Sequence, residues 1–117
     1  MENKERTEHY ELVLCVLDAL HNKVCQILLY GPAALWEPSE SSEIDIAVLT
    51  PYKISADEEE RLSTAVFELN QKHSGKYAVV DIDQAVFEAK RRSLPFYQKI
   101  DRTGIVLWPK QPTVQDR

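Results

Sequence analysis

Two acidic residues in the middle of the chain have the spacing of a metal-binding pair. Glu43 and Asp45 are separated by one residue, in a segment where Ile44, Ile46 and Val48 alternate with other residues. Residues two apart in a strand project from the same face, about 6.5–7 Å apart along the backbone. Neighbouring carboxylates repel one another unless a cation lies between them. The pair therefore predicts either a divalent-metal site open to phosphate oxygens or the solvent-exposed face of an edge strand.

Hydrophobic periodicity and capping residues predict the elements that position this pair. Val13, Val16 and Leu17 recur with a helical period, and Ser55 with Glu58 is a capping-box signature. We expect helices over 6–23, 55–72, 83–92 and 93–103, and strands over 24–30, 43–50, 76–82 and 105–108. This order predicts an α/β (α+β) domain, a small mixed sheet of three to four strands with helices packed on it.

Length and charge limit the classes of function. A chain of 117 residues is expected to form one domain, here 6–109, followed by a polar tail over 110–117. The 19 acidic residues outnumber the 14 basic ones, and a net charge of −5 argues against nucleic-acid binding as the main activity. No apolar run approaches the roughly 20 residues needed to cross a bilayer, and the charged start is unlike a secretory signal, so we expect a cytoplasmic protein without a membrane partner.

The residues upstream of the acidic pair add a second signal. An apolar strand ends at Tyr30, Gly31 and Pro32 follow it, and Glu43 comes twelve residues after Gly31. This arrangement resembles the fingerprint of the minimal nucleotidyltransferases of the DNA-polymerase-β-like superfamily. That fingerprint is a strand, Gly-Ser, ten residues and Asp-x-Asp. The resemblance covers residues 6–109 and implies the nucleotidyltransferase fold.

The resemblance also implies roles for individual residues. The residues matching nucleotide-binding positions are Gly31, Pro32 and Ser42, and the carboxylates matching catalytic and metal-binding positions are Glu43, Asp45 and Asp81. An active member would hold Mg²⁺ or Mn²⁺ on these carboxylates and bind a nucleoside triphosphate over the glycine turn.

Three positions depart from the fingerprint. Pro32 replaces the serine and supplies neither a hydroxyl nor an N–H group, and Glu43 is one methylene longer than aspartate. The third carboxylate of the family is expected near Ala78 or Val79, both apolar, and Asp81 is the nearest acid. Asp81 either ligates the metal or ends the strand and orients the following turn. Whether such a chain is an enzyme stays uncertain from its sequence.

Two functions follow from these departures. The first is a degenerate member that acts by binding, because the resemblance implies a small all-helical partner of the HEPN type, paired as antitoxin and toxin. The alternative is an active, metal-dependent enzyme that transfers a nucleoside monophosphate to a hydroxyl of a protein, an RNA or a small molecule. Leu35, Trp36 and Trp108 form either a docking patch for a partner or part of a small core. The sequence leaves homo-oligomerisation open.

Overall fold

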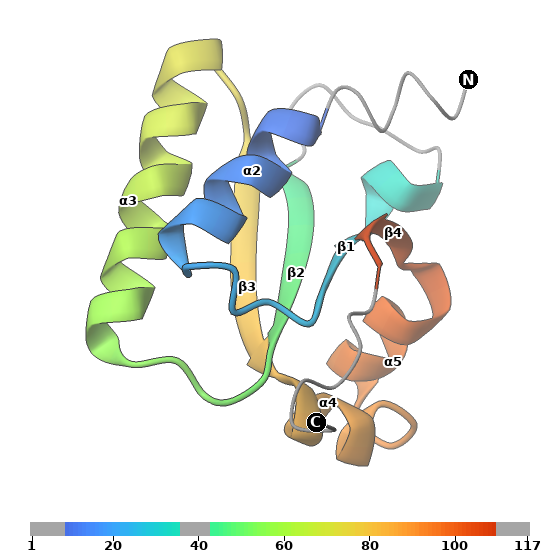
Figure 1. The fold of residues 1–117 in the computed structure, drawn as a ribbon. Coiled ribbons are helices and arrows are strands. Elements are labelled where there is room, and N and C mark those ends of the chain that lie inside the picture. Colours follow the sequence, from blue (N-terminus) through green and yellow to red (C-terminus); the bar gives the residue numbers. More distant parts are fainter. Residues whose placement is uncertain (1–8, 36–42, 110–117) are drawn as a thin grey trace.

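A four-stranded mixed sheet lies at the centre of the protein (Figure 1). The computed structural model describes residues 9–35 and 43–109. The strands are β1 (Gln26–Tyr30), β2 (Ile44–Thr50), β3 (Tyr77–Asp83) and β4 (Ile105–Trp108), in the order β3-β2-β1-β4. β1 runs antiparallel to β2 and β4, whereas β2 and β3 are parallel. β3 is therefore one edge of the described sheet.

Helices cover both faces of the sheet. One face packs against α2 (Tyr10–Ala19) and α3 (Ala56–His73). The other face packs against α4 (Gln84–Lys90) and α5 (Pro95–Thr103). The short 3₁₀ helix η1 (Pro32–Leu35) follows β1. The predicted α/β (α+β) class, with helices on a mixed sheet, is confirmed.

Alternation along β2 divides its side chains between two hydrophobic cores. Ile46 and Val48 belong to the core beneath α2 and α3, and both residues are fully buried. Ala47 and Leu49 belong to the core beneath α4 and α5. The parity predicted from the sequence is confirmed, and it fixes the face from which each functional residue projects.

The helix of the parallel crossover, α3, begins as its sequence predicts. The Glu58 N–H donates to the Ser55 hydroxyl at 3.1 Å, and the Ser55 N–H donates to the Glu58 carboxylate at 2.8 Å. The helix ends before Ser74, which has a left-handed φ of 53°. These two boundaries place α3 between the end of β2 and the start of β3.

The first helix is shorter than predicted. Periodicity extended it to Lys23, but α2 ends at Ala19. His21 and Asn22 adopt positive φ values of 52° and 66°, and the Asn22 N–H donates back to the Leu17 carbonyl at 2.7 Å. Left-handed residues cannot continue an α-helix, so the chain turns here into β1. The predicted polar tail 110–117 lies outside the described residues. Within 9–35 and 43–109, no helix has both the length and the apolar character needed to span a bilayer.

Candidate functional site

The Asp45 carboxylate lies directly over Gly31. Tyr30, the last residue of β1, pairs with Asp45 in the antiparallel ladder, so the turn after β1 lies beside this acid. Gly31 is buried and has a φ of +80°, a conformation that side-chain-bearing residues rarely adopt. A Cβ at this position would stand 2.6 Å from Oδ2 of Asp45. The site therefore requires glycine both for its backbone conformation and for the space that the carboxylate occupies.

Pro32 starts the short helix after the glycine turn. Proline suits the first position of a helix because its φ is already fixed and its missing N–H would have no partner within the helix. The Ala34 N–H donates to the Gly31 carbonyl at 3.0 Å and closes the turn. The turn is well formed, but at residue 32 it offers a ligand neither a main-chain N–H nor a hydroxyl.

Glu43 stands at the entrance to β2. It is exposed, immediately before the strand, and two residues from the partly buried Asp45. Strand alternation places the two acids on the same face of the sheet. The structure thus brings Gly31, Glu43 and Asp45 to one end of the sheet. Ser42 lies outside the described residues.

Tyr30 lies on the same face of the sheet as Asp45, and the pKa of its phenol responds to the Asp45 charge. Burial raises the pKa of the Tyr30 phenol, and the neighbouring Asp45 charge raises it further. The Tyr30 ring meets Phe96 of α5 edge to face, with 5.9 Å between the ring centroids. Aromatic side chains therefore flank the acid on the α5 side. Sequence reasoning missed both residues, although the position of Tyr30 next to Gly31 was a usable signal.

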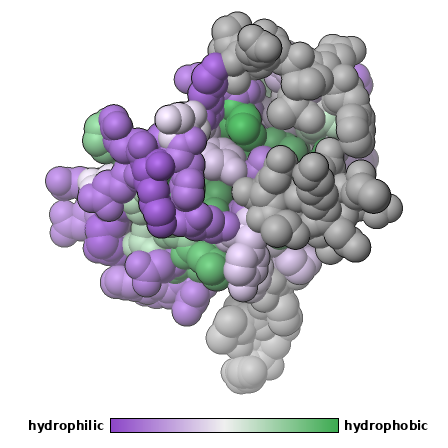
Figure 2. All heavy atoms as spheres, turned by 90° about the horizontal axis from the view of Figure 1, so that it is seen from above, coloured by the Kyte–Doolittle hydropathy of each residue, from purple (hydrophilic) through white to green (hydrophobic). Residues whose placement is uncertain are grey.

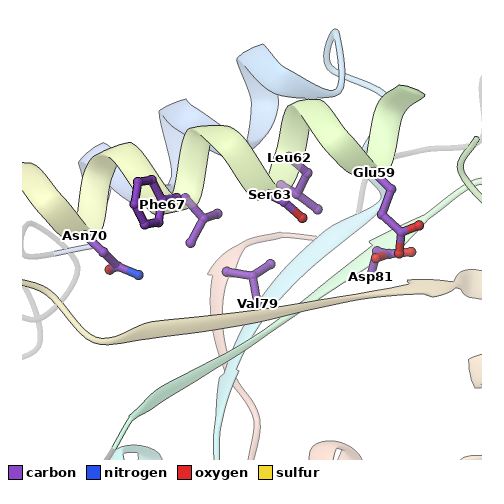
Figure 3. A pocket seen from close by; sticks show the side chains of 8 residues that line it. Glu59, Leu62, Ser63, Phe67, Asn70, Val79 and Asp81 are labelled. Carbon is purple, nitrogen blue, oxygen red and sulfur yellow. The ribbon is translucent and has the colours of Figure 1, made fainter. Parts of the chain in front are cut away.

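Asp81 does not lie beside Asp45, because the parallel register places the two side chains on opposite faces of the sheet. In the parallel register Asp81 pairs with Val48, which lies in the core beneath α2 and α3. Asp45 has the opposite parity and projects from the other face, together with Ala47. The Asp81 side chain instead points toward α3 (Figure 3).

The register also identifies the residue that does lie beside Asp45. Ala78 pairs with Asp45, and Val80 is the next residue of β3 on the same face. Neither side chain can ligate a metal. Across the parts of the chain that the structure describes, no three His, Cys, Asp or Glu side chains are grouped so as to hold a metal ion. The described donors, Glu43 and Asp45, thus do not fit the three-carboxylate Mg²⁺ or Mn²⁺ site that the resemblance implies.

The predicted docking patch is only partly within the described residues. Trp108 is partly buried and packs against the core beneath α2 and α3, which favours the core alternative for this side chain. Its indole Nε1 is buried without a hydrogen-bond partner among the described groups. Trp36 and the side chain of Leu35 lie outside the described part.

Solved structures with a similar fold include toxin–antitoxin proteins. A toxin–antitoxin crystallised with AMP-PNP shares 24% sequence identity, covers 89% of this chain and 73% of its own, and superposes with a TM-score of 0.57. A second match is a complex of a tri-AMPylated HEPN toxin from Shewanella oneidensis with an MNT antitoxin. It shares 22% sequence identity, covers 95% of this chain and 76% of its own, and has a TM-score of 0.53. An MntA–HepT toxin–antitoxin shares 22% sequence identity with this chain. The match covers 94% of this chain and 75% of the other, with a TM-score of 0.52.

The chain has the nucleotidyltransferase fold. No protein-family model and no curated protein matches the sequence, so the likeness rests on three-dimensional structure. Within the nucleotidyltransferase fold, the turn at Gly31 and the acid at Asp45 occupy the end of the sheet where the fingerprint predicts a nucleotide. On the neighbouring strand, Ala78 is the residue that lies beside Asp45.

Proposed function

We propose that this protein is an antitoxin-like binding protein for a helical partner of the HEPN type, and that it acts mainly by forming a complex rather than by transferring nucleotides. The pairing of Asp45 with Ala78 is the observation that carries this proposal. It leaves Glu43 and Asp45 without a third carboxylate from β3. The fold supports it as well, since structurally similar chains occur in complexes of MNT antitoxins with HEPN toxins.

Two further features support binding over catalysis. Pro32 deprives the glycine turn of one main-chain donor and of the hydroxyl expected there. The extra methylene of Glu43 displaces its carboxylate in a type of site where ligand distances are held within about 0.2 Å. Each of the three departures (Pro32, Glu43 and the pairing of Ala78 with Asp45) could be compensated alone. Together they remove groups that would bind phosphate or metal in the same site.

The test is co-expression of this chain with a candidate HEPN-type helical protein, chosen from the genes adjacent to its own. We expect the two to co-purify, and we expect Asp45→Asn to form the complex and relieve toxicity as well as the wild type does. Asp45→Asn removes charge from the candidate site but no part of the fold's core. Failure of the wild-type proteins to associate would contradict the proposal.

Nucleotidyl transfer is the second candidate function, and the position of the Asp45 carboxylate over Gly31 favours it. Among the structural neighbours, one complex contains a tri-AMPylated toxin. Incubation of the complex with each labelled nucleoside triphosphate, with Mg²⁺ or Mn²⁺, separates the two functions. Label that appears on an acceptor and disappears with Asp45→Asn would establish the enzyme. Absence of label, with the complex intact, is the result expected here.

A further inference from the structure

A groove separates α3 from the edge strand β3, on the side of the sheet facing away from Asp45. It has a volume of about 300 Å³. Glu59, Phe67 and Asn70 line it from α3, and Val79 and Asp81 line it from β3 (Figure 3). The proposed function uses none of these side chains. The groove is therefore a separate surface whose chemistry has to be explained.

Among the described residues, no strand pairs with β3 on the side of this groove. The Asn70 side chain accepts a hydrogen bond from the Tyr77 N–H at 3.0 Å and donates one to the Tyr77 carbonyl at 3.1 Å. Main-chain groups lie in the plane of the sheet, and β2 occupies the other side of β3, so Asn70 covers the open edge at Tyr77. Main-chain direction alternates along a strand, so Val79 and Asp81 present their N–H and C=O groups to the same edge.

The side chains above this open edge form an acidic end and an apolar end. Figure 3 shows Glu59 extending from α3 toward Asp81, so that the two carboxylates lie near one another at one end of the groove. Phe67 and Val79 lie further along, and Phe67 has 60% of its surface exposed. The described lining contains no lysine or arginine, and within 9–35 and 43–109 neither carboxylate forms an ion pair.

We infer that this groove binds an extended segment of a partner protein, which adds a strand to the open edge of β3 and places an arginine or lysine beside Asp81 and an apolar side chain beside Val79. In an added strand, alternate side chains face the same way. The bound segment therefore carries its basic and apolar residues two positions apart, whichever direction it runs. The basic group meets Glu59 and Asp81, and the apolar group meets Phe67.

Charge selects this occupant over a second copy of the chain. Two copies paired along β3 would bring Glu59 and Asp81 of each copy to the same edge, and each copy carries a net charge of −5. Like charges on paired edges oppose association, whereas a basic segment neutralises them. Seen from above, the non-grey surface of the molecule is largely hydrophilic, with hydrophobic side chains between the hydrophilic ones (Figure 2).

This inference goes beyond the proposed function, because it concerns the α3 side of the sheet and does not require a HEPN-type partner. Its test uses a capped, fluorescent nine-residue peptide in which threonines alternate with valine and arginine, so that valine and arginine share one face. A second peptide carries glutamate in place of arginine. We expect fluorescence anisotropy to show about tenfold tighter binding of the arginine peptide.

Two double variants, each removing two carboxylates, test whether the peptide binds in this groove. Glu59→Gln/Asp81→Asn removes both carboxylates of the groove, and we expect it to weaken binding of the arginine peptide about fivefold or more. Glu60→Gln/Glu68→Gln changes two residues of α3 that line a different groove, and we expect it to leave binding unchanged. Phe67→Ala should weaken binding of both peptides. Circular dichroism and thermal melting confirm that each variant is folded.

A main-chain readout distinguishes strand addition from simple charge attraction. On binding of the arginine peptide, hydrogen exchange should slow at the Val79 and Asp81 amides but not at those of Ala78 and Val80. A peptide N-methylated at every residue, which presents no main-chain N–H donor to either edge, should not bind. Equal binding of the two peptides, equal loss in both double variants, or unchanged exchange at Val79 and Asp81 would overturn the inference. So would self-association that Phe67→Ala abolishes, because a second copy would then occupy the edge.

Discussion

Asp45 Oδ2 lies 2.6 Å from the position that a Cβ on Gly31 would occupy. The contact joins the end of β1 to the beginning of β2 across an antiparallel pair, Tyr30 with Asp45. It shows that the acid is directed at the glycine bend rather than away from it. The acid and the bend thus lie together at one end of the sheet, and Ala78 lies beside the acid on the neighbouring strand.

Gly31→Ala should destabilise the protein. The left-handed conformation alone costs about 1–2 kcal/mol for a residue with a side chain, and the clash with Asp45 adds to it. Urea unfolding measures the loss. Gly75→Ala is the matched control, because its Cβ would meet the tip of the Asn70 side chain at 3.0 Å and no positive φ is involved. Equal losses in the two variants would show that the bend is not strained as described.

Ala78→Asp should create the missing metal ligand. Aspartate at 78 would lie beside Asp45 in the parallel register and on the same face as Glu43. With Mn²⁺ and ATP at about 100 times their dissociation constant, linkage predicts about 2.7 kcal/mol of stabilisation in this variant and much less in the wild type. Thermal melting measures the difference. Ala78→Asp/Asp45→Asn is the control and should lose the gain, and an equal rise in the wild type would contradict the prediction.

Tyr30 should ionise at a higher pH than an ordinary tyrosine. Burial raises its pKa above the usual 10.0, and the charge of Asp45 adds to the shift. Because the pKa is higher in the folded state, the resulting stability is complete below pH 10 and is lost as the pH rises through the folded pKa. Asp45→Asn should lower the pKa of Tyr30 without restoring the usual value, since burial remains. Tyrosinate absorbance during an alkaline titration, assigned with Tyr30→Phe, would detect no change if Asp45 pointed elsewhere.

Glu11 connects α2 to the end of α3 and should contribute acid-sensitive stability. Its carboxylate accepts hydrogen bonds from Lys72 and His73, at 3.0 and 2.9 Å, and the Lys72 bond is the largest cause of its lowered pKa. A lowered pKa gives stability above the ordinary value of 4.5 that is lost as the pH falls through the folded pKa. Melting temperatures of the wild type and Glu11→Gln should therefore differ near neutral pH and converge in acid. Exposed pairs contribute little, so a small difference is expected. Glu60→Gln removes an exposed carboxylate of α3 and is the matched control for the change in net charge.

Hydrophobic periodicity predicted the strands and the parity of β2, because Ile46 and Val48 alternate cleanly with Asp45 and Ala47. It could not decide between Ala78 and Val79 as the neighbour of Asp45, since every residue of β3 except Ile82 is only partly buried. A strand's hydrophobic pattern specifies its register strongly only where one face is clearly buried, and β3 has no such face. The weakly specified register is why Asp81 appeared to be a ligand. The turn at His21 and Asn22 was missed for a related reason, because periodicity does not report where a helix stops.

Because Asp45 and Asp81 project from opposite faces, the two sides of one sheet can accept sequence changes independently. Amino-acid changes around the glycine bend act on neighbours under α4 and α5, whereas changes near Phe67 act on neighbours under α3. A lineage could thus abandon chemistry on one side while selection continued to refine recognition on the other, without either change disturbing the shared scaffold.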